Sequence, residues 1–263
     1  MLLDVGAPVV EMRFADARPA PVIEVIERFF ASADVLVSED DIAMPQLFVS
    51  DMDSTVIGQE CIDELADFVG LKDQISAITE RAMRGELEFE AALRERVALL
   101  EGLEESAIER CLAERIAANP GAAVLVATLK ARGCRTVLVT GGFHHFADVV
   151  GEMLGFDLVV GNRLAVENGK LTGGLVGDVC DAKTKLATLR EEADRLGVNT
   201  RVLAAGDGAN DIPMMKAADY GFAYKAKPIA RDAAKGRIDT GDLTAILSLL
   251  GIPRRDWIEG WDR

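Results

Sequence analysis

The sequence predicts an α/β fold in which helices cover both faces of a mainly parallel sheet, a Rossmann-like three-layer arrangement. Three short apolar runs have the length of buried strands, and two of them are rich in β-branched residues. They are Leu47–Ser50, Thr136–Val139 and Arg201–Ala205. Helical patterns such as Pro120–Arg132 separate these runs along the chain. Such alternation of strand and helix is typical of a parallel sheet covered on both sides.

A polar cluster follows each predicted strand directly. The clusters are Asp51–Thr55, Thr140–Gly142 and Gly206–Asp211. In open α/β sheets, ligands bind outside the carboxyl ends of the strands. All three clusters occupy such ends, so the sequence predicts that they meet in one functional site.

The remaining segments define the predicted domain organisation. Residues 60–119 read as almost entirely helical, and this stretch interrupts the chain after the first core strand. We therefore expect a helical cap over the strand ends. Residues 46–59 and 120–263 would form the catalytic core, and residues 1–45 a small N-terminal segment or reduced domain with no assigned role. Within the core, we expect a strand and hairpin in 157–177, helices over 183–196, 209–218, 229–235 and 242–250, and short strands at 220–223 and 237–239.

Composition excludes several classes of partner. The net charge is -15, so the surface repels nucleic-acid phosphates and anionic lipid. No apolar run approaches the ~20 residues of a membrane span, and the first residues lack the pattern of a secretory signal. The four cysteines are far apart, which favours free thiols in a reducing cytoplasm over a disulfide or zinc framework. The expected location is therefore cytoplasmic.

Asp51 and Asp53 carry the strongest chemical signal. An ionised aspartate can attack phosphorus and form an acyl phosphate, which divides a hydrolysis into two steps. A carboxyl two residues later can protonate the leaving oxygen and then accept a proton from water. Two aspartates at this spacing also occur in ordinary acidic turns, so the pair on its own leaves that alternative open.

The cluster Gly206–Asp211 supplies further carboxylates. Together with Asp51 they would form a hard oxygen site suited to Mg²⁺, which would offset the repulsion between a carboxylate and a phosphate. The rival interpretation is a dinucleotide-binding fingerprint, because Gly206 and Gly208 match its first two glycines. Asp211 stands where the third glycine should be, which argues against it.

Two further features fit a bound phosphate. Thr140 and Gly141 could present a hydroxyl and a backbone N–H group, and Lys183 could place a cation at the start of a helix. Each has an ordinary alternative: a plain strand-to-helix turn in the first case and a solvated surface lysine in the second.

Taken together and in this order, the motifs resemble those of the haloacid dehalogenase-like phosphatases, and most closely the phosphoserine phosphatase family. The resemblance rests on Asp51–Thr55 with Glu60, on Thr79–Gly85 followed by Phe89 and Arg96, and on Thr140–Phe143, Lys183 and Gly206–Asp211. It spans roughly residues 46 to 250. The family motif that matches Thr140–Phe143 commonly begins with serine, so this chain departs from it at Thr140. Threonine keeps the hydroxyl and adds a methyl group.

The resemblance implies a role for each matching residue. Asp51 would be the nucleophile and Asp53 the general acid and base. The Mg²⁺ ligands would be the side chains of Asp51 and Asp207 and the backbone carbonyl of Asp53, with Asp211 supporting the metal site. The phosphate, or the part of the substrate near the metal, would be held by Thr140, Gly141, Lys183 and Asn210.

The resemblance also implies the substrate. O-Phospho-L-serine carries an ammonium group, from which Glu60 would accept hydrogen bonds, and a carboxylate, which Arg96 would bind bidentately. Met83 and Phe89 would form an apolar lid. The expected activity is hydrolysis to L-serine and phosphate, the last step of L-serine biosynthesis, by a monomer or homodimer. Alternatives are phosphoryl transfer to an alcohol such as homoserine, hydrolysis of another small phosphomonoester, and a non-catalytic phosphate-binding module on the same fold.

Overall fold

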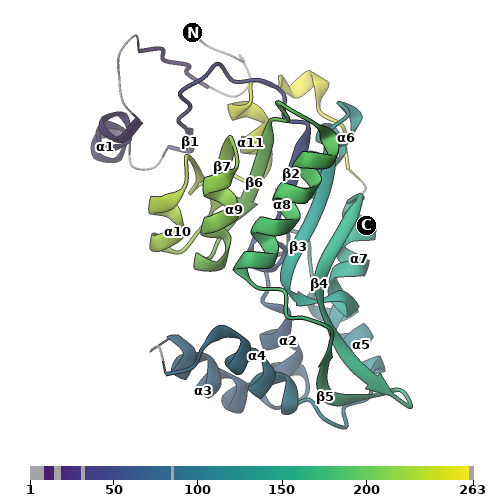
Figure 1. Ribbon diagram of the computed structural model, residues 1–263. Helices are drawn as coiled ribbons and strands as arrows, with labels where there is room; N and C mark the ends of the chain where they lie inside the picture. Colours follow the sequence, from purple (N-terminus) through teal and green to yellow (C-terminus); the bar gives the residue numbers. More distant parts are fainter. Residues whose placement is uncertain (1–8, 15–18, 31–32, 84–85, 261–263) are drawn as a thin grey trace.

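The computed structural model describes residues 9–14, 19–30, 33–83 and 86–260. Within these residues lies one eight-stranded sheet in the order β1-β8-β7-β6-β2-β3-β4-β5 (Figure 1). Neighbouring strands run parallel except at the two edges, where β1 pairs with β8 and β5 with β4 in antiparallel fashion. The strands are β1 (Val35–Leu36), β2 (Leu47–Ser50), β3 (Arg135–Phe143), β4 (Leu158–Glu167), β5 (Lys170–Val176), β6 (Val202–Gly206), β7 (Tyr220–Tyr224) and β8 (Gly236–Ile238).

Helices cover both faces of this sheet, which confirms the predicted α/β class. Phe48 of β2 packs into one core, whereas its neighbours Leu47 and Val49 pack into the other. Because successive side chains of a strand point to opposite faces, a strand buried on both sides reads as a continuous apolar run. One face is covered by α6 (Ala122–Ala131), α7 (His144–Leu154) and α11 (Thr244–Leu249), and the other by α8 (Ala182–Leu196), α9 (Ile212–Ala217) and α10 (Pro228–Ala233).

The segment after β2 is helical, as the sequence predicts. It contains α2 (Cys61–Phe68), α3 (Lys72–Met83), α4 (Phe89–Ala98) and α5 (Ser106–Arg115). Figure 1 shows these helices gathered beside the long β4–β5 hairpin, below the rest of the sheet. The loop after α4 is tied to this hairpin, since the N–H of Gly102 donates to the carbonyl of Leu171 at 2.8 Å. This helical insertion therefore rests partly on the hairpin.

The two ends of the helical insertion leave the core side by side. Ile57 and Ala118 form an antiparallel bridge, and the N–H of Asn119 donates to the carbonyl of Val56 at 2.8 Å. The side-chain amide of Asn119 also donates to the carbonyls of Thr55 and Ile57, at 2.7 and 3.0 Å. Two paired segments, residues 55–57 and 118–119, thus join the insertion to the core directly after the turn that carries Asp51 and Asp53.

One predicted helix is divided in the structure. The sequence favours a single helix over 209–218, but a 3₁₀ turn at Ala209–Asp211 comes before α9. Pro213 lies in the first turn of α9, where the missing N–H costs little and the ring favours a new helix start.

The N-terminal segment contributes α1 (Pro19–Phe29) and the edge strand β1. Glu27 of α1 forms an ion pair with Arg231 of α10 at 2.8 Å, so α1 lies against the end of the sheet that carries β8. No helix among the described residues is both long and apolar enough to cross a bilayer.

Candidate active site

Asp51 lies directly beyond the carboxyl end of the central strand β2. Its N–H donates to the carbonyl of Ala205 on β6 at 2.9 Å, which continues the pairing of the two strands by one residue. The carboxylate is buried, with 4% of the residue exposed, and its Oδ1 accepts the N–H of Met52 at 2.7 Å. Oδ2 accepts no hydrogen bond from the residues that the structure describes, so one oxygen is held and the other remains available.

The lysine beside Asp51 is Lys185. Its Nζ lies 2.7 Å from Oδ1 of Asp51 and 2.7 Å from Oδ1 of Asp211, and its side chain is 1% exposed. Lys183, the lysine predicted for the phosphate site, is exposed in the first turn of α8, so that assignment is corrected to Lys185.

Helix geometry explains this correction. Residues two apart on an α-helix point in nearly opposite directions, so Lys183 and Lys185 cannot share a face. The buried Leu189 is four residues after Lys185 and packs against the sheet. Its spacing from Lys185 was the sequence signal for an inward-facing lysine.

Three buried carboxylates converge at this point. Oxygen atoms of Asp51, Asp207 and Asp211 all lie within 4.8 Å of one another. Oδ2 of Asp211 accepts the N–H groups of Asp207 and Gly208 at 3.2 and 3.0 Å, which closes the loop after β6. A side chain at Gly206 would place its Cβ 2.4 Å from Cγ of Asp211, so only glycine permits this approach.

The charges in this cluster do not balance. Burial, and then the neighbouring Asp211, raise the pKa of Asp51 well above its ordinary value, and burial raises the pKa of Asp207 to about 6. Burial alone would lower the pKa of Lys185, but the carboxylates of Asp51 and Asp211 outweigh it and raise that pKa. Three carboxylates against one buried lysine leave an excess of negative charge among hard oxygen donors. This donor set fits a divalent cation such as Mg²⁺.

Asp53, two residues after Asp51, faces the second polar cluster at Gly142. Its Oδ1 accepts the N–H of Cys61 at 3.1 Å, and a Cβ at Gly142 would lie 2.8 Å from its Oδ2. Burial, with a smaller effect from Glu60, raises the pKa of Asp53 to about 7. A carboxyl with this pKa is partly protonated at neutral pH, which suits a group that both donates and accepts a proton.

The carboxyl-terminal end of β3, where the pairing with β4 is irregular between Val139 and Phe143, faces the same space. Oγ1 of the buried Thr140 accepts the N–H of Gly142 at 2.8 Å. The side-chain amide of Asn162 donates to the carbonyl of Gly141 at 2.7 Å, and its Oδ1 accepts the N–H of Cys180 at 2.8 Å. Asn162 thus links the carboxyl-terminal end of β3 to the segment before α8. No motif in the sequence marks this residue, because an asparagine within a strand has no distinctive spacing.

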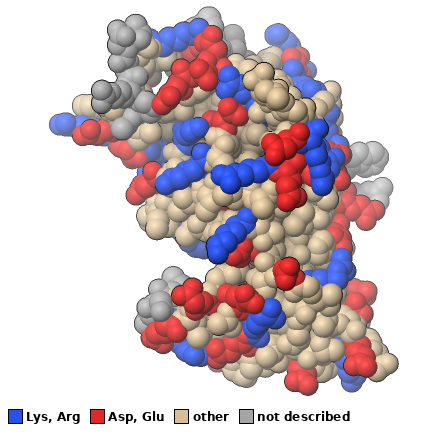
Figure 2. All heavy atoms as spheres, in the orientation of Figure 1, with Lys and Arg blue, Asp and Glu red and all other residues tan. Residues whose placement is uncertain are grey.

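The helical insertion approaches this end of β3 closely. A Cβ at Gly141 would lie 3.5 Å from Cζ of Phe89, the first residue of α4, and Phe89 is 42% exposed. In Figure 2 the surface is hollowed between the insertion and the part of the chain above it. Met83 ends α3, but its side chain lies outside the described residues.

Glu60 and Arg96 interact electrostatically across this region. Burial lowers the pKa of Arg96, while Asp63 and Glu60 act in the opposite direction. Oγ of Ser54 donates to Oε1 of Glu60 at 2.9 Å. The guanidinium of Arg96 donates through Nε to the carbonyl of Ala92 at 3.3 Å, and it forms no ion pair with any carboxylate in the described parts of the chain. Arg96 therefore keeps donors for a ligand.

Asn210 lies next to the carboxylate cluster, in the 3₁₀ turn after β6. A Cβ at Gly208 would lie 2.4 Å from its Oδ1, so a side chain there would displace the Asn210 amide. The turn is fixed on both sides by Asp211 and Gly208, since the N–H of Asp211 donates to the carbonyl of Gly208 at 3.1 Å.

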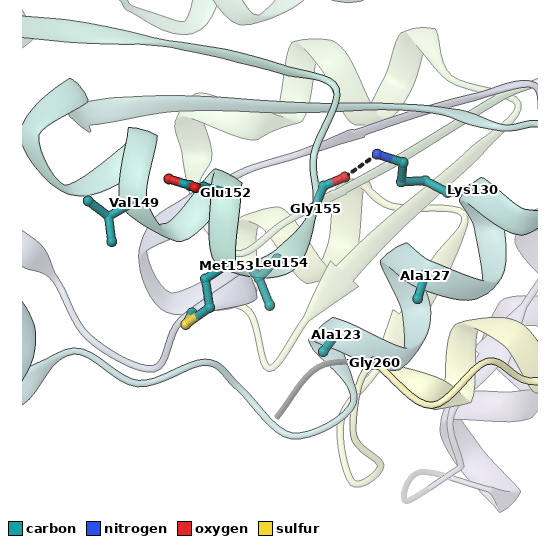
Figure 3. A pocket seen from close by; sticks show the side chains of 9 residues that line it. All are labelled: Ala123, Ala127, Lys130, Val149, Glu152, Met153, Leu154, Gly155 and Gly260. Carbon is teal, nitrogen blue, oxygen red and sulfur yellow. Dashed lines mark hydrogen bonds between the residues drawn. The ribbon is translucent and has the colours of Figure 1, made fainter. Parts of the chain in front are cut away.

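A second concavity lies on the outer side of α6 and α7 and belongs to a different region (Figure 3). It has a volume of about 640 Å³ and is lined mainly by apolar residues such as Ala127, Val149 and Met153. Its lysine, Lys130, is already paired with Asp157 at 2.7 Å. Among the described residues that line it there is no cluster of carboxylates and no unpaired cation, so this cavity lacks the chemistry found at the strand ends.

Comparison with known proteins places the chain in the family that its sequence motifs resemble. A family model described as haloacid dehalogenase-like hydrolase matches residues 48–216. A phosphoserine phosphatase of Albidiferax ferrireducens is 47% identical over 210 residues, which cover 78% of this chain and 89% of that protein. A phosphoserine phosphatase of Archaeoglobus fulgidus is 44% identical over 209 residues, and the matched part is 79% of this chain and 60% of that longer protein. A substrate-bound phosphoserine phosphatase structure superposes with a TM-score of 0.72 at 39% identity, covering 78% of this chain and 98% of the other.

Proposed function

The chain belongs to the haloacid dehalogenase-like hydrolases and, within them, to the phosphoserine phosphatase family, and from this premise we propose that it hydrolyses O-phospho-L-serine to L-serine and phosphate. The observation that carries the proposal is the buried cluster in which Lys185 lies 2.7 Å from Asp51 while Asp207 and Asp211 complete a set of carboxylates.

In the first half-reaction, the carboxylate of Asp51 attacks phosphorus. Its Oδ1 is fixed by Met52 and Lys185, which leaves Oδ2 as the attacking atom. The bond from phosphorus to the serine oxygen breaks, and Asp53 gives that oxygen a proton as it leaves. The raised pKa of Asp53 supports this role, since part of the population holds the proton at neutral pH.

In the second half-reaction, Asp53 is a carboxylate and accepts a proton from a water molecule. The oxygen of that water attacks phosphorus, the acyl phosphate bond breaks, and Asp51 is regenerated. Lys185, Thr140 and Gly141 hold the phosphate oxygens through both steps. Their donors stabilise the negative charge that the equatorial oxygens carry in a phosphoryl transfer.

The carboxylates of Asp51 and Asp207 and the backbone carbonyl of Asp53 would hold Mg²⁺. When bound, the ion offsets the repulsion between Asp51 and the phosphate dianion. Asp211 holds the loop through Gly208 and Asp207 and keeps Lys185 in place, so we assign it a supporting role. Asn210, in the 3₁₀ turn that also contains Asp211, would contact the substrate.

Glu60 and Arg96 would distinguish phosphoserine from other phosphomonoesters. Arg96 has donors to spare for the substrate carboxylate, and Glu60 is held by Ser54 to accept from the ammonium group. Phe89, and Met83 at the end of α3, would exclude water from the closed site. In this proposal residues 60–119 are a cap joined to the core by the bridge between Ile57 and Ala118, and residues 46–59 and 120–263 are the core. The four free cysteines suit a cytoplasmic location.

The test is phosphate release from O-phospho-L-serine in the presence of Mg²⁺, run beside phosphoethanolamine. Phosphoethanolamine keeps the phosphate and ammonium groups but lacks the carboxylate. We expect a kcat/KM on the order of 10⁴ M⁻¹s⁻¹ or more for phosphoserine and a far lower value for phosphoethanolamine. Equal or uniformly slow rates would reject phosphoserine as the substrate. Addition of homoserine tests for phosphoryl transfer, which would yield phosphohomoserine.

A further inference from the structure

The strand β4 supplies none of the residues of the proposed mechanism, but it lies beside the residues assigned to the phosphate. β3 and β4 pair in parallel with Phe143 opposite Asn162, and their register shifts between Val139 and Phe143. Thr140 lies in this irregular stretch of β3. Two consecutive residues of β4, Gly161 and Asn162, approach it there, and each makes a contact that bears on the Thr140 side chain.

Asn162 is buried, with 2% of the residue exposed, and both ends of its side-chain amide are bonded to the main chain. Its Nδ2 donates to the carbonyl of Gly141 at 2.7 Å, and its Oδ1 accepts the N–H of Cys180 at 2.8 Å. Cys180 comes directly before Asp181, the N-cap of α8. Because the start of a helix holds one end of the amide, the other end is fixed where it bonds Gly141.

The peptide group between Gly141 and Gly142 carries this contact on to Thr140. Its carbonyl accepts from Asn162, and its N–H donates to Oγ1 of Thr140 at 2.8 Å. The carbonyl and the N–H of a trans peptide lie in one plane and point in opposite directions, so a bond that holds one group also directs the other. Asn162 and the hydroxyl of Thr140 are therefore joined through one rigid unit.

This arrangement leaves the hydrogen of the Thr140 hydroxyl for a ligand. A hydroxyl can accept at its oxygen and still donate its own hydrogen. Among the described residues, the buried Oγ1 of Thr140 accepts from Gly142 and donates to no acceptor. The Cβ position of Gly142 lies 3.1 Å from this oxygen and 2.8 Å from Oδ2 of Asp53, so the hydroxyl lies on the side of Gly142 that faces Asp53. A buried donor without an acceptor is costly, which favours an acceptor supplied by a ligand at this point.

Gly161 determines the space around the same side chain. A Cβ at Gly161 would lie 3.1 Å from Cγ2 of Thr140 and 3.3 Å from the carbonyl oxygen of Gly142. Both distances are shorter than an ordinary van der Waals contact, so a side chain at position 161 would press on the methyl group of the threonine. Serine in place of Thr140 would remove that methyl group and with it the shorter of the two contacts.

We propose that β4 positions the hydroxyl of Thr140 for a phosphate oxygen. Asn162 orients the hydroxyl through the peptide group of Gly141 and Gly142, and Gly161 leaves space for the methyl group. Asn162 and Gly161 are positioning residues, because they act through Thr140 and not on the substrate. The inference rests on the proposed function only for its ligand, a phosphate group.

The test is a double-mutant cycle on the affinity for inorganic phosphate, measured by calorimetry in the presence of Mg²⁺. Thr140→Val removes the hydroxyl and keeps the shape of the side chain, and Asn162→Ala removes the amide. We expect each single change to raise the Kd about tenfold, the lower end of the loss of one hydrogen bond to a charged group. In the Thr140→Val background, Asn162→Ala should raise the Kd by less than about threefold, since the hydroxyl that it orients is gone. An unchanged Kd in Asn162→Ala, or an equal rise in both backgrounds, would overturn the proposal.

Asn119→Ala is the matched control for the cycle. The amide of Asn119 also bonds the main chain, at the carbonyls of Thr55 and Ile57, but at the base of the helical insertion and not at β3. Any change that this variant makes in the phosphate Kd should be the same with threonine and with valine at position 140. A coupling as large for Asn119 as for Asn162 would indicate a general loss of packing and would reject the role of Asn162.

A second pair of variants tests the space at Gly161. Gly161→Ala should raise the phosphate Kd by about threefold or more, because its methyl group presses on that of Thr140. Combined with Thr140→Ser, which keeps the hydroxyl, the same change should raise the Kd by less than about twofold. Equal losses with threonine and with serine would contradict the positioning by Gly161. A wild-type protein that shows both couplings but does not hydrolyse phosphoserine would reject the proposed substrate and leave this inference standing, and turnover without the couplings would do the reverse.

Discussion

Nζ of Lys185 lies 2.7 Å from Oδ1 of Asp51 and the same distance from Oδ1 of Asp211. The lysine thereby connects the strand end that carries Asp51 with the turn that follows β6. It neutralises only part of the carboxylate charge, and among the described residues it leaves Oδ2 of Asp51 without a hydrogen-bond donor. The proposed attack by the Asp51 carboxylate depends on this arrangement, because one oxygen is held while the other is left for phosphorus.

Replacing this lysine should nearly abolish turnover. In Lys185→Met, Asp51 loses the cation that orients it and the phosphate loses a donor, so we expect kcat/KM for phosphoserine to fall by about 100-fold or more. Lys183→Met is the matched control, because its side chain is exposed on the same helix, and its activity should stay within about twofold of the wild type. A larger loss in the Lys183 variant than in the Lys185 variant would contradict the assignment of Lys185 to the phosphate site.

Removing the guanidinium of Arg96 should change specificity more than chemistry. We expect Arg96→Ala to lower kcat/KM for phosphoserine by about 30- to 100-fold, since a charge-assisted bidentate contact is lost. Phosphoethanolamine has no carboxylate, so its kcat/KM should change little. Arg94→Ala is the control, because Arg94 pairs with Glu90 at 2.8 Å on the exposed side of α4. Equal losses of kcat/KM on both substrates would show that Arg96 does not bind the carboxylate of phosphoserine.

Adding one methyl group at Gly142 should disturb the general acid. A Cβ there would lie 2.8 Å from Oδ2 of Asp53 and 3.1 Å from Oγ1 of Thr140. We expect Gly142→Ala to lower kcat by about tenfold or more, the lower end of a loss of general acid–base catalysis, with a smaller effect on KM. Gly174→Ala in β5 meets only ordinary contacts, the nearest at 3.5 Å, and should keep its kcat. Unchanged kcat in Gly142→Ala would mean that Asp53 can move without loss.

The sequence predicted the position of the site better than its detailed contacts. The strands β2, β3 and β6 were evident because burial on both faces makes them continuous apolar runs, and each ends in a polar cluster. The helical insertion was evident because no strand pattern interrupts it. The choice of Lys183 over Lys185 was wrong because both follow the N-cap Asp181, and only the inward direction of Leu189 separates them.

Contacts between distant segments were the part that the sequence did not reveal. Asn162 reaches Gly141 and Cys180 from a strand, and Arg237 meets Glu27 across 210 positions of the chain. Neither residue belongs to a local motif. Their roles arise only when the sheet order brings the segments together, and strand order is not encoded in the spacing of apolar residues.

Stability at low pH should depend on Asp157. Its carboxylate pairs with Lys130 at 2.7 Å and accepts from the N–H and hydroxyl of Thr136, at 2.8 and 3.1 Å. Burial alone would raise the pKa of Asp157, but these contacts outweigh it and lower the pKa below its ordinary value. The stabilisation is therefore fully present above the unfolded-state pKa of about 3.9 and is lost as the pH falls through the folded-state pKa.

Urea unfolding of Asp157→Asn checks this expectation. At pH 7 the variant should lose about 1 kcal/mol of unfolding free energy relative to the wild type. The difference should shrink as the pH is lowered below about 4. Asp178→Asn, an exposed position, should stay within about 0.5 kcal/mol at both pH values. A difference for Asp157→Asn that grows toward low pH would mean that the folded state raises the pKa of this carboxyl instead of lowering it.

The phosphoryl group is expected to pass through Asp51. The most direct measurement is an acid quench of the enzyme during turnover of ³²P-labelled phosphoserine with Mg²⁺, followed by peptide mapping. We expect hydroxylamine-labile label on the peptide that contains Asp51, and none in the Asp51→Asn variant, which should also lose turnover. Normal turnover by Asp51→Asn, or label retained on another residue in that variant, would contradict a phospho-aspartate at this position.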